Sequence, residues 1–149
     1  MRSKALLCGL LLGTACSGAT LAGDSGEGTN EIISTDGPLR LTVTDAPTAM
    51  GIMFARPVAS VTGSGVTVAN TRYGSECVYA VTGHADVGAN MITLRIAYAE
   101  RLTLCTAEVR ALTYRAEVNG LSQKAYDLQV IHEESGRMDT VLVQHIVLP

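Results

Sequence analysis

Apolar and polar residues alternate one by one through most of the chain after residue 38, and this period of two most limits what it can fold into. In the clearest run every second residue is apolar: Ile92, Leu94, Ile96 and Tyr98. Side chains of a β-strand point alternately to its two faces, so such a run buries one face and exposes the other. No segment sustains the 3.6-residue period of an amphipathic helix. The sequence therefore predicts an all-β fold.

The alternating runs recur at intervals of about 10 residues and predict eight or nine short strands. We expect Asp45-Ala46-Pro47 to end the first strand and Gly83 to end the strand that starts at Cys77. The final run, 139–148, has apolar residues on both faces, as a strand covered on both sides would. Regularly spaced strands with turns between them predict a single antiparallel sandwich or barrel. The runs from which these strands are predicted lie at 39–44, 51–58, 58–61, 66–69, 77–83, 92–98, 102–109, 112–118, 126–132 and 139–148, and adjoining runs can belong to one strand.

Residues 120–130, GLSQKAYDLQV, resemble the turn and strand of bacterial immunoglobulin-like and fibronectin-like domains. Lys124 stands where those domains usually have glycine. In that family the tyrosine follows a corner between two sheets, and its hydroxyl hydrogen-bonds to the backbone. The resemblance implies an immunoglobulin-like β-sandwich of about eight strands over residues 38–149, with Tyr126 at the corner. A small up-and-down β-barrel is the alternative, although the chain has a single Phe and no Trp to line a barrel interior.

Residues 1–15 have the composition of a secretory signal peptide. Arg2 and Lys4 precede an apolar run that is too short to span a bilayer as a helix, which takes about 20 residues. The run ends in Gly13-Thr14-Ala15-Cys16, which resembles the lipobox of bacterial lipoproteins. The resemblance implies that Cys16 is lipidated and holds the protein to the cell envelope, and Ser17 after it favours the outer membrane. The alternative is cleavage after Ala22, which yields a soluble secreted or periplasmic protein.

Residues 16–37 differ in composition from the rest of the chain. After Cys16 this segment is rich in Gly, Ser and Thr, contains four acidic residues and no basic residue, and has no apolar period. Such a segment buries too little apolar surface to fold alone, so we expect a flexible acidic tether. Alternatively, residues 31–34 near the end of this segment form an N-terminal strand.

Residues 38–149 carry nine basic and ten acidic side chains, so the predicted domain is close to neutral. A neutral domain with scattered charges has no electrostatic footprint for nucleic acid and no basic face for anionic lipid. We therefore expect no nucleic-acid partner, and expect any membrane association to come from the anchor on Cys16.

Cys77 and Cys105 are the cysteines beyond the signal region. A pair of cysteines in an exported protein predicts a disulfide. In the chain-entropy description, closing this loop stabilises the fold by about 3.5 kcal/mol. A metal or redox role is the less favoured alternative, because neither a C-x-x-C spacing nor a nearby histidine is present.

His84 and Asp86 form an H-x-D pair that we place in a polar turn spanning 82–90. Such a pair supplies two metal ligands or a base with its orienting carboxylate. His132, Glu133 and His145 would complete a ligand set only if the fold brought them to the same rim. We expect instead that His84 is a solvated turn residue and that His132 and His145 lie at strand edges. Because the chain has no nucleophile elbow, phosphate loop or paired-carboxylate spacing, we expect neither an enzyme nor a cofactor.

Together these observations predict a non-enzymatic envelope lipoprotein whose β-domain is an interaction or structural module. Its partner would be an envelope protein or a surface ligand. The alternative is a periplasmic protein that binds a small ligand or a metal through His84 and Asp86.

Overall fold

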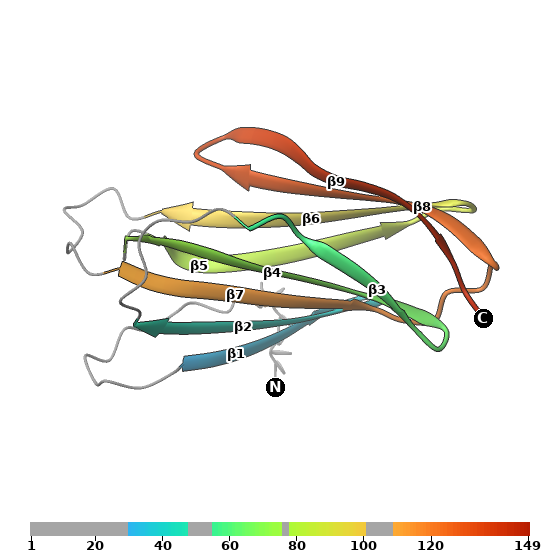
Figure 1. The fold of residues 1–149 in the computed structure, drawn as a ribbon, viewed down its shortest axis with the longest axis horizontal. Helices are drawn as coiled ribbons and strands as arrows, with labels where there is room; N and C mark the ends of the chain where they lie inside the picture. The colour runs from blue at the N-terminus through green and yellow to red at the C-terminus, as the bar shows by residue number, and fades with distance from the viewer. Residues whose placement is uncertain (1–29, 48–54, 76–77, 101–108) are drawn as a thin grey trace, which may run out of the picture.

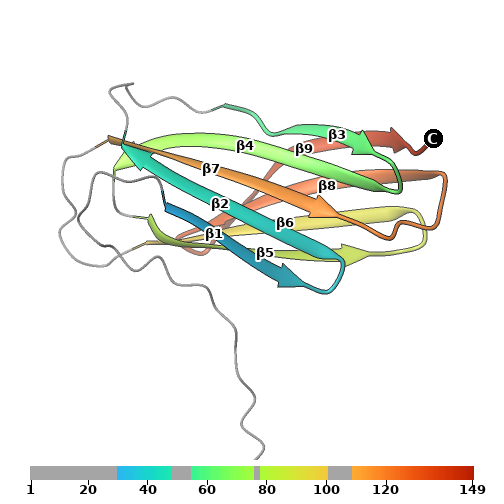
Figure 2. The ribbon, with the colours of Figure 1, turned by 90° about the horizontal axis from the view of Figure 1, so that it is seen from below.

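The computed structural model describes residues 30–47, 55–75, 78–100 and 109–149, and they form two packed β-sheets with no helix. The first sheet has the strand order β1-β2-β7-β4-β3 and the second the order β5-β6-β8-β9 (Figures 1 and 2). The prediction of an all-β sandwich is thus confirmed. The first sheet comprises β1 (Asn30–Asp36), β2 (Leu39–Pro47), β7 (Val109–Val118), β4 (Gly65–Ser75) and β3 (Val58–Thr62). The second comprises β5 (Val78–Val87), β6 (Met91–Glu100), β8 (Ala125–Glu134) and β9 (Arg137–Val147).

The two sheets stay separate. Among the described strands, β1 and β3 form the edges of one sheet and β5 and β9 the edges of the other. Strand β1 lies beside β5, and β3 lies beside β9, but neither pair is joined in a ladder. The alternative of a small closed barrel is therefore wrong.

One strand pair differs from the expected antiparallel arrangement. Strand β8 runs parallel to β6, with Leu94 opposite Val130, while the other pairs are antiparallel. Between β6 and β8 the chain crosses to the first sheet as β7 and crosses back. Each crossing reverses the chain, so β8 runs in the same direction as β6 when it is placed next to it. The second sheet is consequently mixed.

The alternating residues supply the core between the sheets. Every second residue of β6 is buried, as predicted, and the same holds for the inner faces of β7 and β8. Each large aliphatic side chain buried in this way contributes about 1.5–3 kcal/mol relative to leaving it exposed. The largest fully buried side chains are Tyr114, Tyr126, Leu39, Leu41, Ile92, Leu94, Ile96 and Leu128, followed by Val66, Val68, Val118 and Val130.

Tyr126 forms the corner expected of immunoglobulin-like domains. Its ring is buried, and its hydroxyl accepts hydrogen bonds from the backbone N–H groups of Ser122 and Gln123 at 3.1 and 3.0 Å. The hydrogen bond from Gln123 is the main reason that the pKa of Tyr126 lies below its ordinary value. The chain turns at Gly120, whose φ of 74° a side chain would strain. Lys124 does not share that conformation, so the corner closes without the usual glycine.

Several element boundaries differ from the prediction. Asn30–Asp36 is strand β1, paired along its whole length with β2, so the expected tether is wrong for residues 30–36. Strand β2 continues to Pro47 because Asp45 and Ala46 still pair with β7, and β5 continues beyond Gly83 to Val87 because it pairs with β6. Pairing with a neighbouring strand therefore outweighs the tendency of these residues to end a strand.

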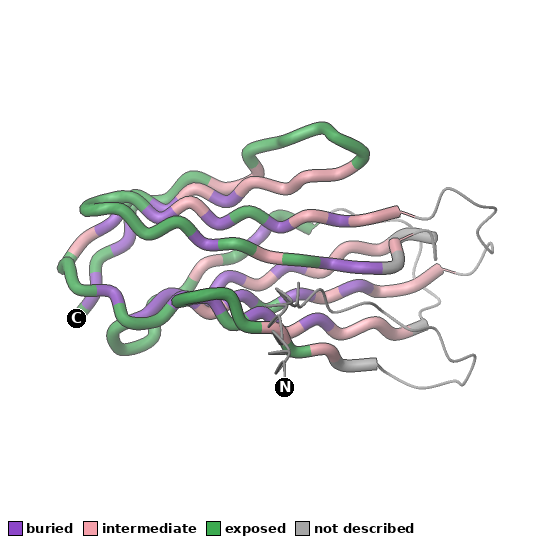
Figure 3. Tube along the Cα trace, turned by 180° about the vertical axis from the view of Figure 1, so that it is seen from behind, coloured by how far each residue is buried: buried purple, intermediate pink, exposed green. Residues whose placement is uncertain are grey.

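Strand β9 is an edge strand and is not covered on both faces as expected. Val143 and Val147 are 72% and 63% exposed. Residues 137–140, at the hairpin that joins β8 to β9, are exposed as well (Figure 3). The expected strand at 51–58 lies partly outside the described residues, and its described part, 55–57, precedes β3. The expected strand at 102–109 lies outside them except for Val109. The hairpin around Gly63 is confirmed.

Candidate functional site

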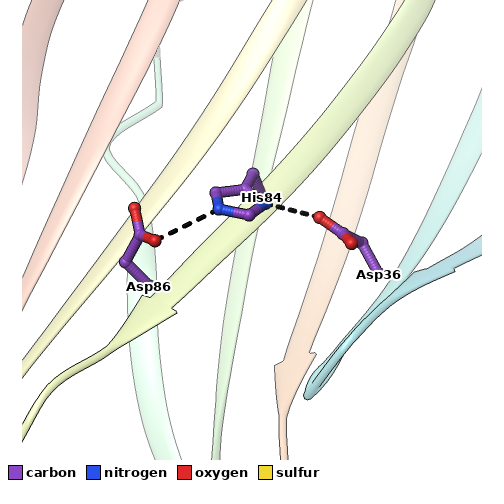
Figure 4. A network of polar contacts seen from close by, with 3 residues as sticks. All are labelled: Asp36, His84 and Asp86. Atoms are coloured by element: carbon purple, nitrogen blue, oxygen red, sulfur yellow. Dashed lines mark hydrogen bonds and ion pairs between the residues drawn. The ribbon is translucent and has the colours of Figure 1, made fainter.

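His84 lies on strand β5, not in the predicted turn. Its cross-strand partner is Arg95 of β6, and Asp86 projects from the same face of β5 two residues later. The side chain is exposed, as expected, but it is not simply solvated: Asp36 from the end of β1 approaches it from the other sheet (Figure 4). The pairing of β1 with β2 carries Asp36 to this edge, and an isolated H-x-D motif gives no sign of it.

The two carboxylates bind opposite sides of the imidazole ring. Nδ1 of His84 lies 2.5 Å from Asp36 Oδ2, and Nε2 lies 3.2 Å from Asp86 Oδ1. The hydrogen bond to Asp36, followed by that to Asp86, raises the pKa of His84 above its ordinary value. In the protonated form both ring N–H groups donate, and the network links the edges of the two sheets.

This geometry does not suit a metal ion. One imidazole nitrogen binds one metal, and a second ligand must lie on the same side of the ring, whereas Asp36 and Asp86 lie on different sides (Figure 4). In the described ranges no group of three His, Cys, Asp or Glu side chains is arranged to hold a metal.

The other histidines are not brought to His84. His145 is exposed on β9, where its Nδ1 lies 2.8 Å from Asp127 of β8. His132 is partly buried between the sheets, and Glu133 follows it on the other face of β8. The expected edge position thus holds for His145 and is wrong for His132.

A second polar cluster lies between the sheets, and sequence reasoning missed it. We call it the inter-sheet polar group; it comprises Arg72 of β4, Tyr98 of β6, Tyr114 of β7, and His132 and Glu134 of β8. The sequence holds one signal for it, because Tyr98, Tyr114 and His132 each continue an alternating inward-facing run. It does not reveal which strands are neighbours.

The contacts of this group cross from one sheet to the other. The Tyr114 hydroxyl lies 2.9 Å from Nε2 of His132, and the His132 ring packs edge-on against Tyr98 and Tyr114 with centroids 5.3 and 5.6 Å apart. Arg72 donates to the Glu134 carboxylate, and its guanidinium carbon lies 5.3 Å from the centre of the Tyr98 ring.

Burial and charge set the ionisation of the group. Burial, and then the charge of Arg72, lower the pKa of His132 to about 4. Burial raises the pKa of both tyrosines, and the hydrogen bond from Arg72 lowers that of Glu134. At neutral pH His132 is therefore uncharged, and Arg72 and Glu134 form an ion pair. In the tautomer that carries its proton on Nδ1, Nε2 accepts the Tyr114 proton.

The most exposed large apolar side chains lie on the edge strands β3 and β9. Four of them exceed half exposure: Val58 at 69% on β3, and Met138, Val143 and Val147 at 58%, 72% and 63% on β9. Strands β3 and β9 lie beside each other at one open side of the sandwich, which we call the β3/β9 side (Figure 2). Val58 faces outward from the first sheet, and Val143 and Val147 face outward from the second. The β1/β5 side carries the Asp36–His84–Asp86 network, and its exposed large apolar side chains, Ile33 at 50% and Val87 at 40%, are less exposed.

The remaining predicted sites lie outside the described residues: Cys16, Cys77 and Cys105. Of the described residues, none belongs to a helix long and apolar enough to cross a membrane. No protein-family model, curated protein or solved structure matches the chain.

Proposed function

We propose that the protein is a non-enzymatic envelope lipoprotein, anchored at Cys16, whose immunoglobulin-like domain binds another envelope protein through the β3/β9 side. The unequal exposure of the two open sides carries this proposal. Exposed apolar side chains concentrated on two neighbouring edge strands favour a protein interaction surface there. The near-neutral charge of residues 38–149 favours a protein surface over nucleic acid or anionic lipid as the partner.

The immunoglobulin-like assignment is supported by the Tyr126 corner. The alternative, a metal-binding protein that uses His84 and Asp86, would require Asp36 and Asp86 to move to one side of the imidazole. No observation favours it over the interaction module.

A disulfide between Cys77 and Cys105 remains part of the proposal. Val78, which follows Cys77, pairs with Glu100, and Cys105 is five residues beyond Glu100. Five residues of chain span at most about 17 Å, so the chain length between Glu100 and Cys105 is compatible with a disulfide to Cys77. Finding two free thiols by peptide mapping of exported protein would contradict the disulfide.

Site-specific photo-crosslinking in living cells tests the interaction surface. A photoreactive amino acid at Val58 or Val143 should give one adduct of defined mass in the envelope fraction, and the same probe at Thr82, exposed on β5, should give none. The substitution Val147→Asp should reduce the Val143 adduct several-fold. Equal adducts from both sides, or none from the β3/β9 side, would contradict the proposed surface. Azido fatty-acid labelling that persists in Cys16→Ala would separately contradict the anchor.

A further inference from the structure

The interior of the sandwich changes in character from one end to the other. Near the Tyr126 corner, the inward-facing positions are aliphatic, such as Leu39, Val66 and Val118, which lie opposite one another on three adjacent strands. Toward the other end of β4, the inward-facing positions become Asn70 and Arg72. Asn70 is buried, and among the described groups its carbonyl oxygen has no hydrogen-bond partner. Polar contacts therefore replace apolar packing where β4 and β7 face β6 and β8.

Those contacts join the two sheets directly. The bond between Tyr114 and His132 connects β7 to β8, and the ion pair between Arg72 and Glu134 connects β4 to β8. Arg72 also lies over the ring of Tyr98 on β6. The strength of all three contacts depends on the charge state of the groups involved.

The charged and titratable groups around His132 come from every strand that packs against it. Arg72 approaches from β4, Tyr114 from β7, and Tyr98 with Glu100 from β6. Glu134 follows on β8, and Asp139 is the cross-strand partner of His132 on β9. Glu134 is already engaged by Arg72, and the side chains of Asp139 and Glu100 are not hydrogen-bonded to the imidazole among the described contacts.

Protonation of His132 disfavours the closed arrangement in two ways. Nε2 changes from an acceptor into a donor, so the Tyr114 hydroxyl loses the acceptor for its proton. A second cation then lies close to Arg72 in a partly buried space, where repulsion is poorly screened.

We propose that the inter-sheet polar group is an acid-released latch, which closes this end of the sandwich at neutral pH and lets β4 and β7 part from β6 and β8 when His132 gains a proton. Among the described residues, the aliphatic end of the core holds no histidine, so it stays closed. The latch is independent of the β3/β9 side, so either proposal can fail without the other.

The pH range follows from the ionisation of His132. Its pKa is about 4 with the latch closed and about 6.5 when the imidazole is solvated, so the open form binds more protons between these values. Opening is therefore least favoured above pH 6.5 and becomes steadily more favoured as the pH falls toward 4. Between pH 7 and pH 5 the opening constant should rise about twentyfold.

Amide hydrogen exchange of the full-length protein, corrected for the intrinsic pH dependence of exchange, measures this opening. The twentyfold rise should appear at residues 70–72 and 132–134, and these amides should exchange faster than those of residues 92–94 at every pH, because local opening needs less free energy than global unfolding. His132→Gln, which cannot be protonated, should abolish the rise, while the matched control His145→Gln should retain it. A rise that survives in His132→Gln, or equal exchange rates at the two ends of the sandwich, would overturn the latch.

A titration of His132 by NMR keeps the proposal testable if His132→Gln does not fold. The wild-type imidazole should titrate below pH 5, and Tyr114→Phe, which removes the hydroxyl, should move its midpoint upward. An imidazole that titrates near pH 6.5 in the wild-type protein would overturn the latch.

Discussion

At the scale of single residues, Gly83 illustrates how closely the edges of the two sheets approach. It faces inward from β5, and a Cβ added there would lie 3.0 Å from Leu39 Cδ2 and 3.1 Å from Leu41 Cδ2 on β2. The sequence predicts that the strand ends at Gly83, because glycine generally weakens strands. Here it is retained inside a strand because a side chain would collide with the opposite sheet.

The substitution Gly83→Val should therefore destabilise the protein by about 1–3 kcal/mol, since it inserts a branched side chain against packed leucines. Denaturant unfolding of the purified protein measures the difference. Gly88→Ala is the matched control, because a Cβ at Gly88 meets only the carbonyl oxygen of Met91 at an ordinary 3.5 Å. Equal stability of Gly83→Val and the wild type would show that the sheets do not approach each other at this position.

The histidines show where residue-level prediction ends. His84 and Asp86 are recognisable from their spacing, but Asp36 is 48 residues from His84 and becomes its partner only through the pairing of β1 with β2. The inward position of His132 follows from the period of two, whereas its hydrogen bond to Tyr114 depends on which strands face one another. Spacing identifies candidate residues, and topology determines their partners.

At the scale of elements, the central strands follow from alternation and the edge strands do not. Strands β6, β7 and β8 each have a full run of buried residues at every second position, so their faces are fixed by the sequence pattern. Strand β1 contributes no residue to the buried core, and its pairing with β2 is what makes it a strand. Apolar residues on both faces of β9 indicate a covered strand, yet the fold places β9 at an edge. Apolar residues on both faces of a strand therefore do not show whether the rest of the chain covers both faces.

At the scale of the whole molecule, the strand order creates two unlike open sides and one polar end. Strand β1 beside β5 brings Asp36 to His84, and the strands that carry the most exposed valines, β3 and β9, lie beside each other. The return of the chain through β7 brings β8 next to β6 and sets His132 against Tyr98 and Tyr114. The predicted sandwich contains none of this detail, because alternation specifies faces and leaves the order and direction of strands open.

The parallel pairing of β6 with β8 is the arrangement on which the polar end and the two open sides depend, and backbone NMR contacts measure it directly. A parallel pair in this register should give amide-to-Hα contacts that connect Leu94 with the neighbours of Val130, with no close Hα–Hα contact between the strands. Close Hα–Hα contacts between β6 and β8, which only an antiparallel pair produces, would contradict the strand order.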